Sequence, residues 1–179
     1  MTKLWLKSKR CRRISRRGDN RRMASFLDKL CPRSELALRV GALVQPIVFT
    51  NGVFDILHRG HVTYLEQARA LGASLVIALN SDTSARGLGK GPGRPLNSEA
   101  DRACVLAALT SVDLVTLFDE ATPVELLKLV RPQVYAKGGD YDIEALEETR
   151  WVRSWGGRAL ALGFVDGYST SALVARIRA

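Results

Sequence analysis

Histidine and cysteine are rare in this chain of 179 residues, which contains only two of the first and three of the second. The cysteines, Cys11, Cys31 and Cys104, are odd in number and widely spaced, and no C-x-x-C pair occurs. This pattern argues against a disulfide framework or a cysteine zinc site and favours a reducing compartment. No apolar run approaches the roughly 20 residues that a membrane span needs. We therefore expect a cytoplasmic protein without a membrane partner.

Acidic residues are also scarce, but only near the N-terminus. The first 33 residues hold twelve of the 27 Lys and Arg and two of the 18 Asp and Glu, which leaves 15 basic and 16 acidic residues in the rest. The net charge of +9 therefore belongs to an N-terminal arm, and we expect no nucleic-acid partner. The arm lacks the apolar segment of a secretory signal, while a transit peptide and a basic disordered arm stay open as interpretations. We favour a chain that starts at Met23, with residues 1–22 disordered or non-native.

Strand-like and helix-like patterns alternate from residue 46 onward, after a helical lead-in over residues 23–44. Short apolar runs predict strands at 46–50, 74–79, 112–118, 131–137 and 158–163. Apolar residues at helical spacing predict helices at 61–71, 98–109, 122–130, 142–155 and 169–178. The expected N-caps are Ser98, Thr122 and Ser169, Gly72 is the expected end of the first helix, and residues 80–95 are expected to form a glycine-rich loop. Strands that are apolar from end to end indicate a parallel sheet covered on both faces, so residues 45–179 are predicted to form a single α/β domain with a doubly wound sheet of about five strands.

Both histidines fall between the first strand and the first helix, in F49-T-N-G-V-F-D-I-L-H-R-G-H-V62. A doubly wound domain binds its ligand beyond the carboxyl ends of the strands, where this stretch lies. A helix N-terminus binds phosphate, Gly60 lets a ligand approach the backbone, and the imidazoles of His58 and His61 can stabilise charge on a phosphoryl group. Two other interpretations stay open: histidines that only cap the helix, and a metal site of Asp55, His58 and His61, for which a further His or paired Cys is lacking.

Polar residues also follow the second strand, where Asn80 is expected at the edge of the site. The loop after it presents Arg86, Lys90 and Arg94 between four glycines. Such a loop is suited to close over a polyphosphate, where its cations offset negative charge. A flexible surface loop without a role would have the same composition.

Two further segments follow later strands. K137-G-G-D-Y141 can bind phosphate through Lys137 while Asp140 binds sugar hydroxyls, or it can be a tight turn with a structural ion pair. Y168-S-T-S171 opens the last helix with three hydroxyls in a row, although an ordinary N-cap needs only Ser169. Both segments are expected at the same edge of the sheet as the histidines.

H58-R-G-H61 resembles the HxGH signature of the nucleotidyltransferase superfamily, a Rossmann-like group that transfers nucleotidyl groups from ATP or CTP. The resemblance continues in order through L79-N-S-D82, R94-P-L-N-S-E-A-D-R102, K137-G-G-D-Y141 and G167-Y-S-T-S-A-L173, and covers about residues 45–178. As a set these segments are similar to the adenylyltransferases of bacterial ADP-heptose synthesis, which act on D-glycero-β-D-manno-heptose 1-phosphate. The resemblance implies a lipopolysaccharide-core enzyme that forms ADP-heptose and pyrophosphate.

The resemblance also implies roles for individual residues. The implied catalytic residues are His58, His61, Lys90 and Arg94. The implied nucleotide-binding residues are Thr50, Asn51, Gly52, Phe54, Asp55, His58, Gly60, His61, Asn80, Arg102, Lys137, Gly139, Tyr168, Ser169, Thr170 and Ser171, with Arg102 near the leaving pyrophosphate. Asp55, Lys137 and Asp140 are implied to bind the acceptor. The expected cofactor is Mg²⁺ held through the phosphates of ATP, with no metal site on the protein. The expected partners are ATP, heptose 1-phosphate, a separate sugar kinase in the pathway and a second copy in a homodimer.

Other functions stay open at this stage. A different HxGH cytidylyltransferase or adenylyltransferase would act on glycerol phosphate, ethanolamine phosphate or phosphopantetheine. A nucleic-acid-binding protein would depend on its basic arm, so that removal of residues 1–22 would abolish its function. A nucleotide-binding regulator without catalysis is the third alternative, and the intact pair of His58 and His61 argues against it.

Overall fold

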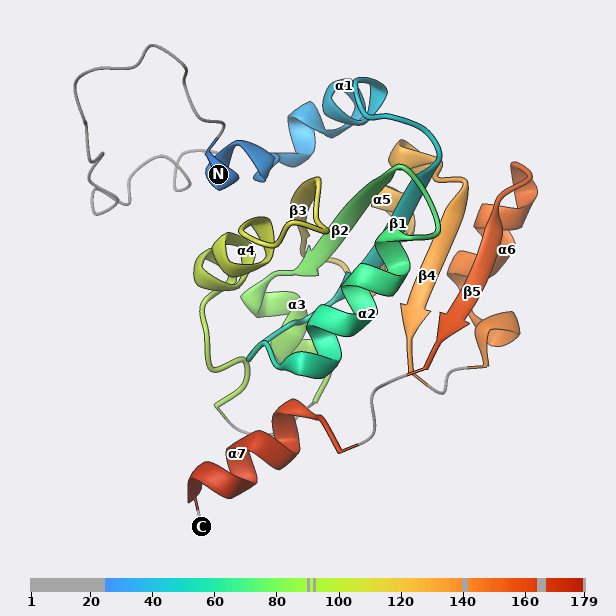
Figure 1. The fold of residues 1–179 in the computed structure, drawn as a ribbon. Coiled ribbons are helices and arrows are strands. Elements are labelled where there is room, and N and C mark those ends of the chain that lie inside the picture. The colour runs from blue at the N-terminus through green and yellow to red at the C-terminus, as the bar shows by residue number, and fades with distance from the viewer. Residues whose placement is uncertain (1–24, 90, 92, 140–141, 164–166, 179) are drawn as a thin grey trace, which may run out of the picture.

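Five parallel strands form the centre of the fold, in the order β3-β2-β1-β4-β5 (Figure 1). They are β1 (Ile47–Gly52), β2 (Ser74–Asn80), β3 (Leu114–Phe118), β4 (Val134–Gly138) and β5 (Arg158–Leu162). The computed structural model describes residues 25–89, 91, 93–139, 142–163 and 167–178. The arm of residues 1–22 and the candidate site residues Lys90 and Asp140 lie outside these ranges. The predicted class and the number of strands are confirmed.

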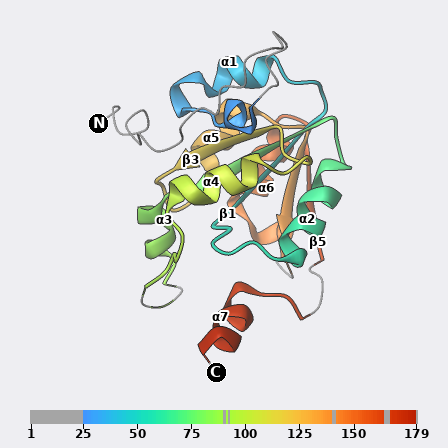
Figure 2. The same ribbon diagram turned by 60° about the vertical axis from the view of Figure 1, so that its left-hand side comes forward.

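Helices cover both faces of the sheet (Figures 1 and 2). Helices α2 (Arg59–Arg69) and α4 (Glu99–Ala107) pack on one face, where Leu65 and Leu106 meet Val48 and Leu75 of the strands. Helices α1 (Leu36–Gly41), α5 (Val124–Val130) and α6 (Glu147–Ser154) pack on the other face, against strand residues that include Phe49. Because successive strand residues point to opposite faces, both faces must be apolar, which explains the unbroken apolar runs in the sequence.

Two helices lie at the carboxyl ends of the strands. Helix α7 (Thr170–Arg178) lies beyond the sheet near the start of α2, and both views show this position (Figures 1 and 2). Helix α3 (Asp82–Gly87) occupies the first part of the segment predicted as a glycine-rich loop, so that prediction was wrong for these residues. The local cause is Ser81, whose Oγ accepts a hydrogen bond from the Ser84 N–H at 3.1 Å and caps the helix.

Several predicted boundaries were wrong for local reasons. Strand β4 starts at Val134 because Arg131, at φ +46°, ends α5 in the left-handed conformation. Pro123 takes the N-cap position of α5 and no side chain caps that helix, so Thr122 is not its cap. Helix α2 ends at Arg69; Gly72 is required instead by packing, since a Cβ there would lie 2.5 Å from the carbonyl oxygen of Pro46.

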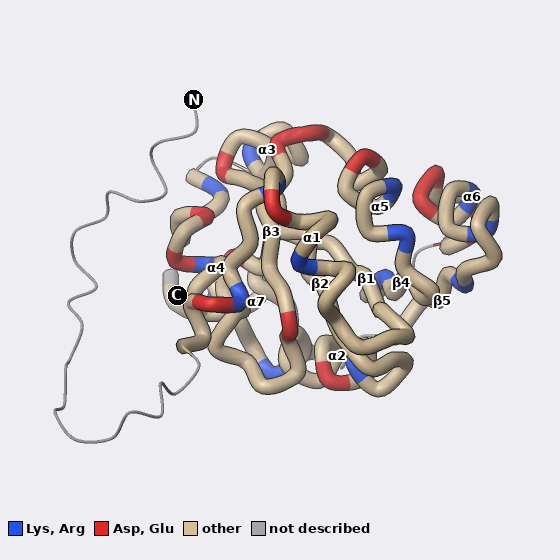
Figure 3. Tube along the Cα trace, turned by 90° about the horizontal axis from the view of Figure 1, so that it is seen from above, with Lys and Arg blue, Asp and Glu red and all other residues tan. Residues whose placement is uncertain are grey.

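The lead-in before the sheet is helical but contains little α-helix. It consists of the 3₁₀ helices η1 (Phe26–Lys29) and η2 (Arg33–Glu35), followed by α1, and a third 3₁₀ helix, η3 (Ile143–Ala145), precedes α6. The backbone N–H of Cys31 donates to the Val115 carbonyl at 2.8 Å, which fixes the lead-in to the edge strand β3. Basic and acidic residues are interspersed over the described part of the chain (Figure 3). Among the described helices, none combines the length and apolar character needed to cross a bilayer.

Candidate active site

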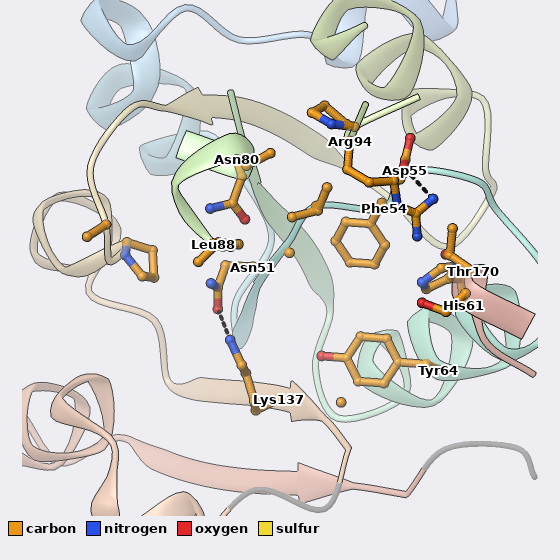
Figure 4. A pocket seen from close by; sticks show the side chains of 18 of the residues that line it. Asn51, Phe54, Asp55, His61, Tyr64, Asn80, Leu88, Arg94, Lys137 and Thr170 are labelled. Carbon is orange, nitrogen blue, oxygen red and sulfur yellow. Dashed lines mark hydrogen bonds and ion pairs between the residues drawn. The ribbon is translucent and has the colours of Figure 1, made fainter. Parts of the chain in front are cut away.

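A pocket of about 490 Å³ opens at the carboxyl ends of the central strands (Figure 4). Asn51 lines it from the end of β1, Asn80 from the end of β2 and Lys137 from β4. The strand order reverses around β1, which is where a doubly wound sheet leaves a crevice for a ligand. The volume is within the usual range for small-molecule sites.

The two histidines stack on each other at the N-terminus of α2. Their ring centroids are 3.9 Å apart, with an angle of 19° between the planes. His61 lines the pocket, and the Phe54 ring meets it edge-on at a centroid distance of 5.4 Å. His58 is the N-cap residue, yet its side chain makes no capping hydrogen bond, so the interpretation of a capping His58 side chain is wrong.

The environment of His58 favours a neutral ring. Burial lowers its pKa, and a backbone hydrogen bond offsets this only in part. Among the described residues, its buried Nδ1 atom has no hydrogen-bond partner. A phosphate bound nearby would stabilise the protonated form, so we expect nucleotide binding to raise the pKa of His58.

Close packing explains two of the glycines in this segment. A Cβ on Gly60 would lie 3.1 Å from His58 Nδ1 and 3.1 Å from the Tyr168 Cβ, so the absence of a side chain lets α2, His58 and α7 meet. A Cβ on Gly52 would lie 2.9 Å from the ring of Phe54. Phe54 itself adopts φ +45°, a strained conformation for a bulky residue that directs its ring into the pocket wall.

Asp55 holds the segment that follows the glycine-rich loop. One carboxylate oxygen, Oδ1, accepts the N–H groups of Leu96 at 2.8 Å and Asn97 at 3.0 Å, and Oδ2 pairs with Arg94 Nη1 at 2.9 Å (Figure 4). The Asp55 side chain is 6% exposed and that of Arg94 is 15% exposed. Both residues line the pocket. The Asp55 carboxylate thus positions Arg94 in the pocket wall, and its predicted ligand contact stays a prediction.

Arg102 does not reach the pocket, contrary to the prediction that it contacts pyrophosphate. Its side chain is fully buried, and its guanidinium donates to the Asn97 carbonyl at 3.1 Å, the Val53 carbonyl at 2.6 Å and Asp82 at 2.8 Å. These bonds join the stretch before α2, the start of α4 and the start of α3. Arg102 therefore supports the walls of the site from behind.

Thr50 is also behind the wall rather than in the pocket. It is fully buried, and its Oγ1 lies 2.6 Å from Tyr64 Oη, which donates to the Ala136 carbonyl at 3.0 Å. Burial raises the pKa of Tyr64, whose ring lines the pocket. This chain of hydrogen bonds fixes β1, α2 and β4 relative to one another.

Lys137 and Asn51 face each other across neighbouring strands. Lys137 Nζ donates to Asn51 Oδ1 at 3.1 Å, and Tyr135 Oη donates to the same oxygen at 2.9 Å (Figure 4). Gly139 does not line the pocket; it turns the chain at φ +114°, and its N–H donates to the Leu162 carbonyl at 3.0 Å. Lys137 thus presents a positive charge at the end of β4.

The start of α7 closes the pocket on the side of the histidines. Thr170 and Ser171 line the pocket. Ser169 instead caps the helix, where its Oγ accepts the Ala172 N–H at 3.0 Å, as predicted. Tyr168 lies 6.3 Å from the His58 ring, between centroids, and outside the pocket lining.

The structure brings most of the predicted residues together and separates the others from the pocket. Those that line it are Asn51, Gly52, Phe54, Asp55, His61, Asn80, Arg94, Lys137, Thr170 and Ser171. Those behind it or beside it are Thr50, His58, Gly60, Arg102, Gly139, Tyr168 and Ser169. The lining residues that the sequence did not indicate are Val53, Tyr64, Ala85, Leu88, Pro95, Ala121, Pro123, Gly138 and Glu148. Most of these are apolar, and nothing in their local sequence distinguishes them from core residues.

Two carboxylates in or beside the site are paired with arginines. Asp55 pairs with Arg94, and Asp82 pairs with Arg102. Over the described residues, no group of three or more His, Cys, Asp or Glu side chains gathers in a way that could hold a metal ion.

The chain is similar to known nucleotidyltransferases over most of its length. It is 58% identical over 157 residues to the D-beta-D-heptose 1-phosphate adenylyltransferase of Bordetella bronchiseptica, covering 87% of this chain and 97% of that protein. It is 54% identical over 135 residues to the bifunctional protein HldE of Magnetococcus marinus, covering 75% of this chain but only 28% of that longer protein.

Solved structures share the fold. The crystal structure of the lipopolysaccharide core biosynthesis protein from Thermoplasma volcanium matches with a TM-score of 0.57 and 29% identity, over 69% of this chain and 98% of that one. Pantoate-beta-alanine ligase from Francisella tularensis matches with a TM-score of 0.52 and 12% identity, over 75% of this chain and 66% of that one, which shows the fold alone. Residues 49–175 match the family described as cytidylyltransferase-like. Because of this match, and in agreement with the stacked histidine pair at the N-terminus of α2, the chain belongs to this family of nucleotidyltransferases.

Proposed function

We propose that the protein transfers the adenylyl group of ATP to D-glycero-β-D-manno-heptose 1-phosphate and so forms ADP-heptose and pyrophosphate for the lipopolysaccharide core. The observation that carries the proposal is the 58% identity to the Bordetella heptose 1-phosphate adenylyltransferase over 97% of its length. The pocket at the switch point of the sheet is lined by the cations Arg94 and Lys137 and by His61, a hydrogen-bond donor, as such anionic substrates need.

The proposed reaction is a direct in-line displacement at the α-phosphorus of ATP. An oxygen of the sugar phosphate forms a new bond to this phosphorus, and the bond to the bridging oxygen of the β-phosphate breaks, so that pyrophosphate leaves. The attacking phosphate is already anionic, so no side chain has to remove a proton. Catalysis then rests on the placement of two anions and the stabilisation of charge in the transition state.

The proposed roles follow the positions of the side chains. His61, which lines the pocket at the N-terminus of α2, would donate a hydrogen bond to the phosphates, where the unpaired helix N–H groups also favour negative charge. His58, stacked on His61 outside the pocket lining, keeps its predicted role at the α- and β-phosphates. Arg94 would contact the triphosphate, and Lys90 keeps its predicted role there. Lys137 would bind the phosphate of the acceptor.

Magnesium fits this arrangement as a companion of the nucleotide. Because Asp55 and Asp82 are paired with arginines, the protein offers few free carboxylates at the site, and the triphosphate would supply the ligands. The ion would neutralise charge on the leaving pyrophosphate.

The proposal also covers the source of the acceptor, the compartment of the reaction and the oligomeric state. The chain is similar to 28% of the length of HldE, which is described as bifunctional, and a sugar kinase in the pathway stays our prediction for the source of the heptose 1-phosphate. Since ATP is the proposed donor, we expect the reaction to occur in the cytoplasm. The homodimer stays a prediction.

Pyrophosphate release from ATP with a panel of acceptors tests the proposal. The panel contains heptose 1-phosphate, hexose 1-phosphates, glycerol phosphate, ethanolamine phosphate and phosphopantetheine. We expect the highest kcat/KM with heptose 1-phosphate, and higher turnover with ATP than with CTP. A preference for any of the last three acceptors would refute the proposal in favour of another transferase of the family.

The same assay tests the histidines. We expect His58→Ala and His61→Ala each to lower turnover by ~10²–10³, the scale for loss of one transition-state donor. Glu66→Gln, an exposed change on the same helix, is the matched control. Removal of residues 1–22 should leave turnover unchanged, whereas a nucleic-acid-binding protein would lose its function with this arm.

A further inference from the structure

Glu148 is a buried residue of the pocket wall that the sequence motifs do not include. It belongs to the first turn of α6, is 7% exposed and lines the pocket. None of the hydrogen bonds and ion pairs among the described residues involves its carboxylate, although six ion pairs occur elsewhere in that part of the chain. The neighbouring Glu147, in contrast, is exposed and accepts a hydrogen bond from Trp151 Nε1 at 3.3 Å.

A carboxylate in this position can accept hydrogen bonds from a ligand. Burial of a charge is unfavourable unless hydrogen bonds or an opposite charge compensate it. An ionised carboxylate only accepts hydrogen bonds, and it repels phosphate. The part of the ligand that lies against Glu148 therefore carries hydroxyl donors rather than phosphate oxygens.

The position of Glu148 distinguishes it from the phosphate-binding side of the pocket. His61 lies at the start of α2, on one face of the sheet, and Thr170 approaches it from α7 (Figure 4). Glu148 begins α6 on the other face, where α5 and α6 share one apolar cluster, and Pro123 at the start of α5 lines the same pocket. Lys137, at the end of β4, carries a positive charge between these sides.

Two hydroxyl-bearing groups enter this pocket in the proposed reaction, the ribose of ATP and the acceptor sugar. The hydroxyls of Thr170 and Ser171 and the start of α2 offer the nucleotide its contacts on the α2–α7 side. The α5–α6 side is left for the acceptor, whose phosphate must reach the α-phosphorus while its ring extends away from the triphosphate. This ring is neutral and rich in hydroxyl donors, as the environment of Glu148 requires.

We propose that Glu148 accepts hydrogen bonds from hydroxyl groups of the acceptor sugar and makes the site selective for hydroxyl-rich sugar phosphates. The inference rests on the proposed function, because it assumes that a sugar 1-phosphate is the acceptor. It adds a specificity-determining residue on the face of the sheet opposite the HxGH segment.

Steady-state kinetics of Glu148→Gln tests the inference, with ATP and heptose 1-phosphate varied separately. We expect the KM for heptose 1-phosphate to rise ~10–100-fold, the scale for loss of a charge-assisted hydrogen bond to a substrate, while the KM for ATP stays within about twofold. Glu147→Gln is the matched control and should change neither constant. The melting temperature of Glu148→Gln should equal or exceed that of the wild type, since the change removes a buried charge without breaking an internal pair.

A second measurement uses acceptors that lack single hydroxyls, on the wild-type enzyme and on Glu148→Gln. Removal of the hydroxyl that Glu148 contacts should lower kcat/KM of the wild type ~10–100-fold, but that of Glu148→Gln by less than about threefold. Equal losses in both enzymes at every position would overturn the inference, as would an unchanged KM for heptose 1-phosphate in Glu148→Gln.

Two other results would also overturn it. A rise in the KM for ATP alone would assign Glu148 to the ribose, and a defect that excess Mg²⁺ restores would assign it to the metal. The wild-type enzyme separates this inference from the function on which it rests. If the wild-type enzyme released no pyrophosphate with any sugar 1-phosphate, the proposed function would fail. If the wild type were active but Glu148→Gln behaved like Glu147→Gln, only the role of Glu148 would fail.

Discussion

Replacement of Asp55 is the perturbation for which the structure gives the clearest expectation. Its carboxylate accepts two backbone N–H groups, those of Leu96 and Asn97, and pairs with Arg94 at 2.9 Å. The carboxylate of Asp55 is 6% exposed and the side chain of Arg94 15%, so water does not readily replace these contacts. In Asp55→Ala, two amides and one guanidinium would lose their partner at once.

The expected loss of stability follows from these contacts. Removal of one partner from a buried charged network costs about 3–5 kcal/mol, because the remaining groups stay desolvated. Asp55→Asn keeps one acceptor oxygen but loses the ion pair, so we expect a smaller loss of about 1–3 kcal/mol. Both changes also release Arg94 from its position in the pocket wall, and we expect kcat/KM to fall while the KM values for both substrates rise.

Equilibrium unfolding in urea, followed by circular dichroism, measures the free energy of unfolding, and pyrophosphate release measures kcat/KM. Asp119→Asn, a change at an exposed carboxylate after β3, is the control and should stay within about 0.5 kcal/mol of the wild type. If Asp55 only bound a substrate, Asp55→Asn would keep the stability of the wild type and raise a single KM. That result would refute the positioning role that we assign to the Asp55 carboxylate.

Three further predictions concern the walls of the site. Gly60→Ala places a Cβ 3.1 Å from both His58 and Tyr168. This contact should displace His58 slightly, and we expect turnover to fall at least ~10-fold. In the control Gly41→Ala the new Cβ meets no atom within 4 Å, so turnover should stay unchanged. Arg102→Met leaves two carbonyl groups and Asp82 without their donor, and thermal unfolding should show a loss of about 2–4 kcal/mol; an equal melting temperature with a raised KM for ATP would instead support a pyrophosphate contact. Burial lowers the pKa of His58 in the folded state below the ordinary value of 6.5, so the unfolded state binds more protons just below pH 6.5 and stability falls as the pH decreases through that range. In His58→Gln this part of the pH dependence of the free energy of unfolding should disappear, and an unchanged pH profile would contradict a lowered pKa.

Local sequence patterns predicted the sheet because each strand obeys a rule that needs no knowledge of its neighbours. Strands buried on both faces must be apolar throughout, and β1, β2 and β4 satisfy this rule with almost no exposed residue. Errors occurred where one residue or one distant contact decided the outcome. Arg131 in the left-handed conformation delays β4, and Gly72 is needed because the carbonyl of Pro46, the residue before β1, approaches it. A sequence pattern records neither a single dihedral angle nor the approach of a distant backbone atom.

The difference between local patterns and distant contacts also explains which half of the site was predicted. The half that we propose to bind phosphate is formed by contiguous segments, in which glycine, histidine and hydroxyl residues stand in order and their chemistry can be read from the sequence. The half around Glu148 and Pro123 is assembled from the first turns of α5 and α6, and its members become neighbours only when both helices pack on the same face of the sheet. In the sequence Glu148 is one of three glutamates among residues 144–148, and only its burial separates it from Glu144 and Glu147. If Glu148 binds the acceptor as proposed, residues of this half can change without any change to the segments proposed to bind the phosphates.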